Sequence, residues 1–176
     1  PEHFLALSNL GIVFSQLREF SRAVELFNKA IKINPDYAEG YNNLGNALFE
    51  LSEFDKSLHY YKRAVQLNPG FSDAFNNLGV ALKKLGQLDK AIESYNNALV
   101  INPNDADAHN NLGIVFYEQE RLDEAIRSFY KAAEINPNLA DVYNNIGHTF
   151  RKFKNYEDAF YAYEKAIEIN PDFAIA

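Results

Sequence analysis

The dipeptide Asn-Pro returns at a fixed interval of 34 residues along this chain of 176 residues. It occupies Asn34-Pro35, Asn68-Pro69, Asn102-Pro103, Asn136-Pro137 and Asn170-Pro171. A fixed repeat of this length is typical of small units stacked on one another, not of a globular domain with one closed core. Stacked units of this kind offer a long surface to a partner, so the period bears on function as well as on fold.

The repeat divides the chain into five units, and we number the positions 1 to 34 within each of them. The units are 4–37, 38–71, 72–105, 106–139 and 140–173. Residues 1–3 and 174–176 are in phase with the end of a preceding unit and the start of a following one. We therefore expect residues 1–176 to form a single array, with remnants of flanking repeats at both ends.

Each unit has the pattern of two helices. Positions 4, 7, 11 and 14 are mostly apolar, as are positions 17, 21, 24 and 28, which is a helical spacing. In the second unit these are Tyr41, Leu44, Leu48 and Leu51, then Phe54, Leu58, Tyr61 and Val65. An acid or serine at position 18 suits a helix start, where amide groups lack partners. The proline at position 32 ends the second helix, because proline cannot continue it.

Three positions keep their character in every unit: glycine at 8, an aromatic residue at 24 and alanine at 27. The glycines are Gly11, Gly45, Gly79, Gly113 and Gly147. A glycine within a helix costs about 1 kcal/mol relative to alanine. Its recurrence at one phase predicts that two helix backbones approach each other closely there, as a requirement of the core.

These residues resemble the tetratricopeptide repeat (TPR) family, whose pattern is a large aromatic, Leu-Gly, a second aromatic, Ala, an aromatic, Ala and Pro. The resemblance covers nearly the whole chain. The departures are Leu7 and His109 at the first aromatic, Leu48 and Leu82 at the second, and Ser57 at an alanine. The resemblance implies an all-α fold, an α-solenoid of antiparallel helix pairs wound into a right-handed superhelix. It also implies that the first helix of each pair lines the concave face.

The composition excludes several classes of function. The net charge is −7, from 24 acids and 17 bases, whereas nucleic acids and anionic membranes are bound by positive surfaces. The absence of cysteine excludes disulfides, thiolate zinc sites and cysteine nucleophiles. No apolar run approaches the roughly 18 residues of a membrane span, and no segment has the layout of a signal peptide. We expect no nucleic-acid partner, no direct membrane insertion and a cytoplasmic protein.

Six positions of the first helix lie away from its apolar stripe when the sequence is plotted at about 100° per residue: 2, 5, 6, 9, 12 and 13. Position 6 is asparagine in all five units, and position 5 is asparagine in four. We predict a partner-binding groove lined by these positions. Its residues are Asn9, Asn42, Asn43, Asn46, Phe49, Asn76, Asn77, Val80, Lys83, Lys84, Asn110, Asn111, Ile114, Tyr117, Asn144, Asn145, His148 and Arg151.

The asparagines have two interpretations. An amide side chain offers a donor and an acceptor, which matches a peptide backbone, so a ladder of them can hold an extended chain without reading its sequence. Alternatively, asparagine is simply common at position 6 in this family and bonds within the scaffold. The sequence leaves both open.

The other groove positions are expected to set specificity. Position 2 forms an acidic row of Glu39, Asp73, Asp107 and Asp141. An alternative for part of this row is that its acids stabilise the starts of the first helices and have no role in binding. The apolar residues Ile12, Phe49, Val80, Ile114 and Tyr117 have no expected role in the core. Exposed apolar groups within a polar rim favour a surface for a partner.

Two subtypes of the family are informative. TPR co-chaperones grip an acidic C-terminal tail with lysine at position 2 and asparagine at position 6. An acid at position 2, as here, repels a terminal carboxylate, which argues against that subtype. The asparagine row also resembles, less closely, the TPR region of O-GlcNAc transferases. That resemblance implies a ladder that holds protein substrates, although no catalytic domain is present.

No catalytic motif is apparent, since the chain has no Gly-rich phosphate loop, no Gly-x-Ser-x-Gly and no His-Glu-x-x-His. His109 falls at a core aromatic position, His59 on the expected surface and His148 in the expected groove, without a second ligand at metal spacing. We therefore expect no enzyme activity, no cofactor and no metal.

The preferred function is a non-catalytic scaffold that binds an extended peptide or a helix of a partner protein. One alternative is a homo-oligomer that stacks head to tail through the array ends, with Phe160 and Tyr163 at the exposed end. Another is a substrate-recruiting arm of a larger glycosyltransferase.

Overall fold

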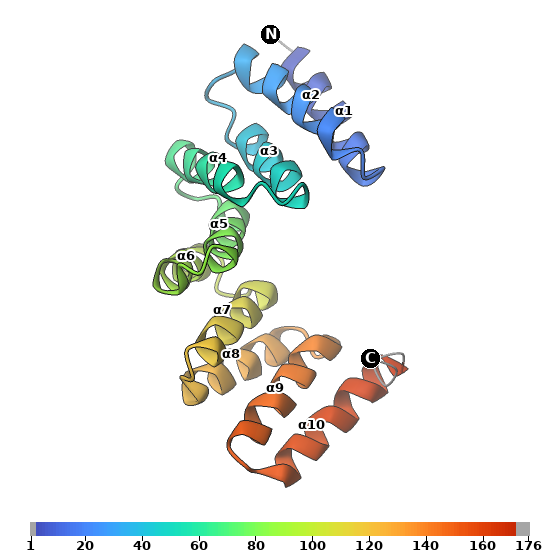
Figure 1. Ribbon diagram of the computed structural model, residues 1–176, viewed down its shortest axis with the longest axis vertical. Coiled ribbons are helices and arrows are strands. Elements are labelled where there is room, and N and C mark those ends of the chain that lie inside the picture. The colour runs from blue at the N-terminus through green and yellow to red at the C-terminus, as the bar shows by residue number, and fades with distance from the viewer. Residues whose placement is uncertain (1–2, 172–176) are drawn as a thin grey trace. The chain divides into compact units, whose positions relative to one another are not determined.

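The computed structural model describes residues 3–171, which fold into ten α-helices and contain no strand (Figure 1). The remaining residues, including nearly all of both expected remnants, lie outside the described range. The helices are α1 (His3–Gln16), α2 (Phe20–Ile33), α3 (Ala38–Glu50), α4 (Phe54–Leu67), α5 (Ser72–Lys84), α6 (Leu88–Ile101), α7 (Ala106–Glu118), α8 (Leu122–Ile135), α9 (Ala140–Lys152) and α10 (Tyr156–Ile169). The expected all-α class is confirmed.

The contacts divide the chain into two compact units, Pro1–Ile101 with α1 to α6 and Asn102–Ala176 with α7 to α10. In the first unit, α1 packs on α2, α3 on α4 and α5 on α6, while α2 also packs on α3 and α4 on α5. In the second unit, α7 packs on α8, α8 on α9 and α9 on α10. Each unit is therefore a stack of helix pairs, which is the arrangement expected of a solenoid.

The Asn-Pro dipeptide ends the second helix of each pair by two linked interactions. The backbone N–H of Asn68 donates to the carbonyl of Ala64, and its side-chain Oδ1 then accepts from the backbone N–H of Gly70 at 3.0 Å. Asn34 and Asn136 form both of these bonds, and Asn102 forms the side-chain bond to the N–H of Asn104. Asparagine precedes the proline because its side chain satisfies a backbone donor in the turn. The sequence interpretation had assigned the turn to proline alone.

The first helix of each pair ends with a residue in the left-handed region at position 15. Arg18, Ser52, Glu120 and Lys154 have φ of 60°, and Gly86 has φ of 70°. Around Gly86, the N–H groups of Gly86 and Gln87 donate to the carbonyls of Lys83 and Leu82. These bonds satisfy carbonyls that a helix end leaves without partners.

The glycine at position 8 makes room for a ring rather than for another backbone, so the predicted close approach of two backbones is wrong. A Cβ atom added to Gly45 would lie 2.6 Å from Cε1 of Tyr61, and one added to Gly79 would lie 2.6 Å from Cε1 of Tyr95. The other three repeats repeat this relationship with the aromatic residue of position 24. The ring is buried against the first helix, so both positions are constrained together.

The outermost helices expose residues that their counterparts bury. Leu10 of α1 is 46% exposed, because no described helix pair covers this face, whereas Leu44, at the same position of the second repeat, is fully buried. At the other end, Phe160 of α10 is 63% exposed. Tyr163, which was expected to be exposed with it, is half-buried, since its hydroxyl contacts His148.

Candidate partner-binding surface

The predicted groove residues lie on the first helices of the pairs, and most are at least partly accessible. The acidic row is fully on the surface, with Glu39, Asp73, Asp107 and Asp141 all exposed. Asn9, Asn46, Lys84 and Arg151 are also exposed, whereas Asn43, Phe49, Asn76, Val80, Lys83, Asn111, Ile114, Tyr117, Asn144 and His148 are half-buried.

Asparagines of neighbouring repeats are hydrogen-bonded to one another. The side-chain nitrogen of Asn77 donates to Oδ1 of Asn42 at 3.0 Å, and that of Asn145 donates to Oδ1 of Asn110 at 3.0 Å. In both pairs the position-6 amide donates to the position-5 amide of the preceding repeat. The asparagines therefore have a structural role between repeats, which is the second of the two interpretations that the sequence left open.

Asn42 is only 5% exposed, so its side chain lies beneath the surface and does not line an open groove as expected. Its oxygen is buried under the amide of Asn77. A projection of one helix could not reveal this burial, because the covering group belongs to the next repeat. Position 6 keeps a second N–H and an acceptor oxygen after the bond between repeats is made.

Position 9 on the first helix faces the aromatic ring of position 24 on the second helix. The hydroxyl of Tyr61 donates to Oδ1 of Asn46 at 2.8 Å, and the hydroxyl of Tyr163 lies 2.9 Å from Nδ1 of His148. Where position 24 is phenylalanine, in the first and fourth repeats, position 9 is isoleucine. This pairing was missed, although the matched identities within the one sequence carried the signal. The third repeat, with Val80 and Tyr95, departs from it.

Two pockets are built from the same six repeat positions. Each takes positions 9, 12, 13 and 24 of one repeat and positions 6 and 9 of the next. In Pro1–Ile101 the lining residues are Ile12, Ser15, Gln16, Phe27, Asn43 and Asn46. In Asn102–Ala176 they are Ile114, Tyr117, Glu118, Phe129, Asn145 and His148. Each cavity measures about 290 Å³, and each has phenylalanine at position 24.

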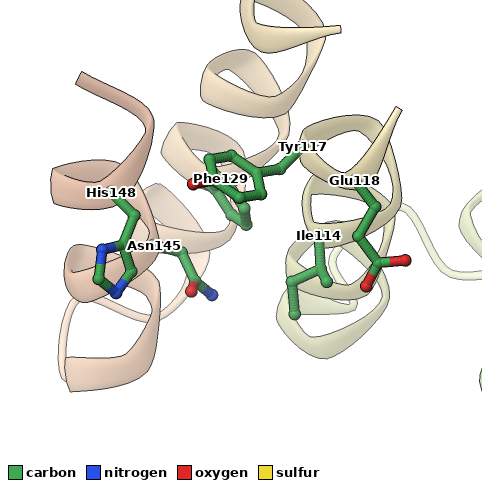
Figure 2. A pocket seen from close by; sticks show the side chains of 6 residues that line it. All are labelled: Ile114, Tyr117, Glu118, Phe129, Asn145 and His148. Carbon is green, nitrogen blue, oxygen red and sulfur yellow. The ribbon is translucent and has the colours of Figure 1, made fainter. Parts of the chain in front are cut away.

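Figure 2 shows the pocket of the second unit between two helices. Ile114, Tyr117 and Glu118 project from α7 on one side, while Asn145 and His148 project from α9 on the other. Phe129 of α8, which is 1% exposed, lies between them. The pocket therefore has an apolar base with an amide, an imidazole and a carboxylate around it.

Charged groups surround this pocket unevenly. The ammonium group of Lys152 lies 4.5 Å from the centre of the Tyr117 ring and 3.4 Å from Oε1 of Glu120. Burial, together with the positive charge of Arg151, lowers the pKa of His148. Nε2 of His148 lies 3.3 Å from the amide nitrogen of Asn144, so both ring nitrogens have partners.

Phe49 was expected to have no role in the core, but its ring has a packing contact. Its ring meets that of Phe54 edge to face, with centroids 5.1 Å apart. His109 is half-buried at the core aromatic position, and its Nε2 lies 3.0 Å from the carbonyl oxygen of Pro103. His59 is exposed, as expected.

Residues 3–171 contain no cluster of three or more histidine, aspartate or glutamate side chains arranged to hold a metal ion. In the same range, every helix is too short or too polar to cross a lipid bilayer.

Models described as "TPR repeat" or "Tetratricopeptide repeat" match most of the chain. One matches residues 11–52 and 81–120, and the others match 38–71, 60–93 and 104–172. A comparison with curated proteins gave no match.

Several solved structures have the same fold. MamA has a TM-score of 0.84 at 24% identity, covering 94% of this chain and 97% of its own. YrrB, described as "a TPR protein with an unusual peptide-binding site", has a TM-score of 0.77 at 28% identity, covering 96% and 87%. PilF of Pseudomonas aeruginosa has a TM-score of 0.89 at 21% identity, covering 96% and 77%.

The paired helices, the glycine set against an aromatic ring in every repeat and the matches to the repeat models lead to one conclusion: this chain belongs to the tetratricopeptide repeat family.

Proposed function

We propose that the protein is a non-catalytic interaction module that holds an extended segment of a partner protein along its first helices. The observation that carries the proposal is the pair of equivalent pockets, each with an apolar base and a position-6 asparagine beside it. An apolar pocket with a few polar groups around it is the usual form of a binding site. The likeness to YrrB, a protein described as having a peptide-binding site, supports the same class of function.

The asparagines are proposed to contribute in two ways. The bond from Asn77 to Asn42, and that from Asn145 to Asn110, fixes the orientation of the position-6 amide. A fixed amide costs less conformational entropy when it binds, which favours affinity. The second N–H and the oxygen of the same amide are then directed to the carbonyl and N–H groups of the bound segment.

The matched pair of Asn43 and Asn77 can separate binding from scaffolding. Asn43 lines a pocket and, within residues 3–171, its side chain forms no hydrogen bond, because the preceding repeat has Ser8 at position 5 and Ser8 is bonded to Tyr37. Asn77 bonds to Asn42. We therefore expect Asn43→Ala to affect the binding of a partner alone, and Asn77→Ala to affect both binding and stability.

The experiment begins with selection of 12-residue peptides from a display library on the immobilised protein, followed by titration of a selected peptide in solution. Asn43→Ala should weaken this peptide about tenfold while the unfolding midpoint stays constant. Equal affinity of the wild type and Asn43→Ala would refute the ladder. Selection of no peptide above background would refute the interaction module itself.

A second candidate function is self-association through the outermost helices. Leu10 of α1, and Phe160 and Ile167 of α10, are exposed at positions that are buried or half-buried in the other repeats. Sedimentation velocity at increasing concentration tests this candidate. If this candidate is right, the wild type associates and the variants Phe160→Glu and Ile167→Glu do not. A wild type that stays monomeric at roughly 500 µM, the upper end of the micromolar range in which exposed apolar surfaces associate, would exclude self-association.

A further inference from the structure

We propose that the pocket of α7, α8 and α9 takes an apolar side chain of the bound segment, and that a lysine or arginine next to that side chain pairs with Glu118. This inference rests on the proposed function and deepens it, because it assigns the chemistry that the segment must carry. It concerns one unit, so all of its residues belong to Asn102–Ala176.

The size and base of the pocket suit a single side chain. The cavity of about 290 Å³ lies just below the range for sites of small-molecule ligands, which runs from about 300 to 1,000 Å³. Ile114, Tyr117 and the buried ring of Phe129 supply apolar surface. A leucine, isoleucine or phenylalanine side chain can fill this space, with its backbone next to the amide of Asn145.

The pair Ile114 and Phe129 keeps the pocket open. In the second repeat the equivalent residues are Asn46 and Tyr61, and the tyrosine hydroxyl extends to the asparagine and bonds with it. Phenylalanine lacks that hydroxyl and isoleucine offers nothing to bond with it. The phenylalanine–isoleucine pair therefore determines that this pocket accepts an apolar group.

The charge around the pocket selects the neighbour of that group. Glu118 is exposed, lines the pocket and forms no ion pair within residues 3–171. The nearby cations are Lys152, which is held by Glu120 and the Tyr117 ring, and the exposed Arg151, whose charge acts on His148. Asp107 and Asp141, near the starts of α7 and α9, are exposed as well. A cation next to the apolar anchor meets a complementary carboxylate, which favours association.

The equivalent pocket of Pro1–Ile101 provides an internal control for the charge. It has the same isoleucine and phenylalanine, as Ile12 and Phe27, but Gln16 stands where the other pocket has Glu118. We expect it to take an apolar anchor without preference for a neighbouring charge.

The test uses four blocked nine-residue peptides of serine and glycine that differ only in their central pair: Leu-Lys, Ser-Lys, Leu-Glu and Leu-Ser. Binding is followed by NMR through the methyl groups of Ile114 and Ile12 and the side-chain amide of Asn145. Leu-Lys should shift the Ile114 methyl most strongly, and Ser-Lys should lose at least tenfold in affinity. Leu-Glu should bind several-fold more weakly than Leu-Lys at this pocket, by a factor that shrinks in 0.5 M salt, where the Debye length falls to a few ångströms.

Two variants and one control sharpen the result. Ile114→Asn with Phe129→Tyr copies the Asn46–Tyr61 pair, which the chain already accommodates, and should weaken Leu-Lys binding as followed at the side-chain amide of Asn145, while the Ile12 shift remains. Glu118→Gln should remove the preference for Leu-Lys over Leu-Glu. Asn46→Ile with Tyr61→Phe, made in another repeat, should leave Leu-Lys binding at Ile114 unchanged.

The failures are distinguishable. If all four peptides shift the asparagine amides equally and Ile114 does not respond, the interaction module stands and the pocket assignment is overturned. If Leu-Lys and Leu-Glu bind equally at Ile114 in low salt, the role of Glu118 is overturned. If none of the peptides shifts any resonance and library selection also fails, the proposed function falls with the inference.

Discussion

The hydroxyl of Tyr61 donates a hydrogen bond of 2.8 Å to the side-chain oxygen of Asn46, across the two helices of one repeat. Tyr61 is 2% exposed, and burial, with a contribution from Glu50, raises the pKa of its hydroxyl far above the ordinary value. The hydroxyl therefore remains a donor throughout the physiological pH range. The same pair of positions is phenylalanine and isoleucine in the two repeats that have the described pockets, so one pair of residues sets both packing and pocket.

Tyr61→Phe should lower the free energy of unfolding by about 1 kcal/mol, because one hydrogen bond is lost and its partner Asn46 becomes hydrated. Adding Asn46→Ile should recover most of this loss, since the double variant copies the pair Phe27 and Ile12. Urea midpoints at constant slope measure both changes. A double variant less stable than Tyr61→Phe would show that the two positions are not exchangeable between repeats.

The sequence predicted the helices well because the 34-residue period fixes where each turn must be. It identified the apolar positions and the asparagines at positions 5 and 6, but it could not assign what they touch. Asn42 is buried by a side chain of the next repeat, and the glycines face a ring rather than a backbone. Such contacts depend on how far one helix pair is displaced from the next. A helical projection of a single segment contains no information about that displacement.

Asn77→Ala should lower stability more than Asn42→Ala does. Removal of the Asn77 amide leaves the buried oxygen of Asn42 without a partner, at a cost of about 1–3 kcal/mol, of which a gain of about 0.5 kcal/mol in helix propensity offsets part. Removal of the Asn42 side chain leaves the half-buried Asn77 amide able to bind water. A double-mutant cycle should give a coupling of about 1 kcal/mol. Additive effects would mean that the bond between repeats contributes nothing in solution.

Gly79→Ala should destabilise the fold, by up to about 2 kcal/mol. Alanine improves helix propensity by about 1 kcal/mol, but its Cβ would lie 2.6 Å from Cε1 of the buried Tyr95 ring, and overpacking of a core costs about 1–3 kcal/mol. Because that ring is confined on all sides, we expect the steric cost to exceed the gain. Gly70→Ala, in the turn between α4 and α5, is the control for a glycine that leaves room for a Cβ atom, since its nearest added contact is 3.4 Å, to Oδ1 of Asn68. A variant at Gly79 as stable as the wild type would show that the ring shifts freely.

His148 should make the free energy of unfolding depend on pH, and the substitution His148→Asn should remove this dependence. Burial, and then Arg151, lower its pKa below the ordinary 6.5, so the unfolded chain binds a proton more readily than the folded one. Its contribution is therefore complete above about pH 6.5 and is lost as the pH falls through the lowered pKa of the folded state. Protonation also removes the acceptor at Nε2 that faces the amide nitrogen of Asn144.

The control for this prediction is His148→Asn, which reproduces the pair of Asn46 and Tyr61 and keeps a partner for the Tyr163 hydroxyl. Between pH 7.5 and 5, a range of roughly one unit or more on each side of the ordinary histidine pKa, the unfolding midpoint of the wild type should fall more than that of the variant. The difference between the two curves isolates His148, because His59, His109 and the carboxyl groups are present in both proteins. Parallel curves over this range would mean that His148 has the same proton affinity in the folded and unfolded chains, and that the contact with Asn144 does not depend on its neutral form.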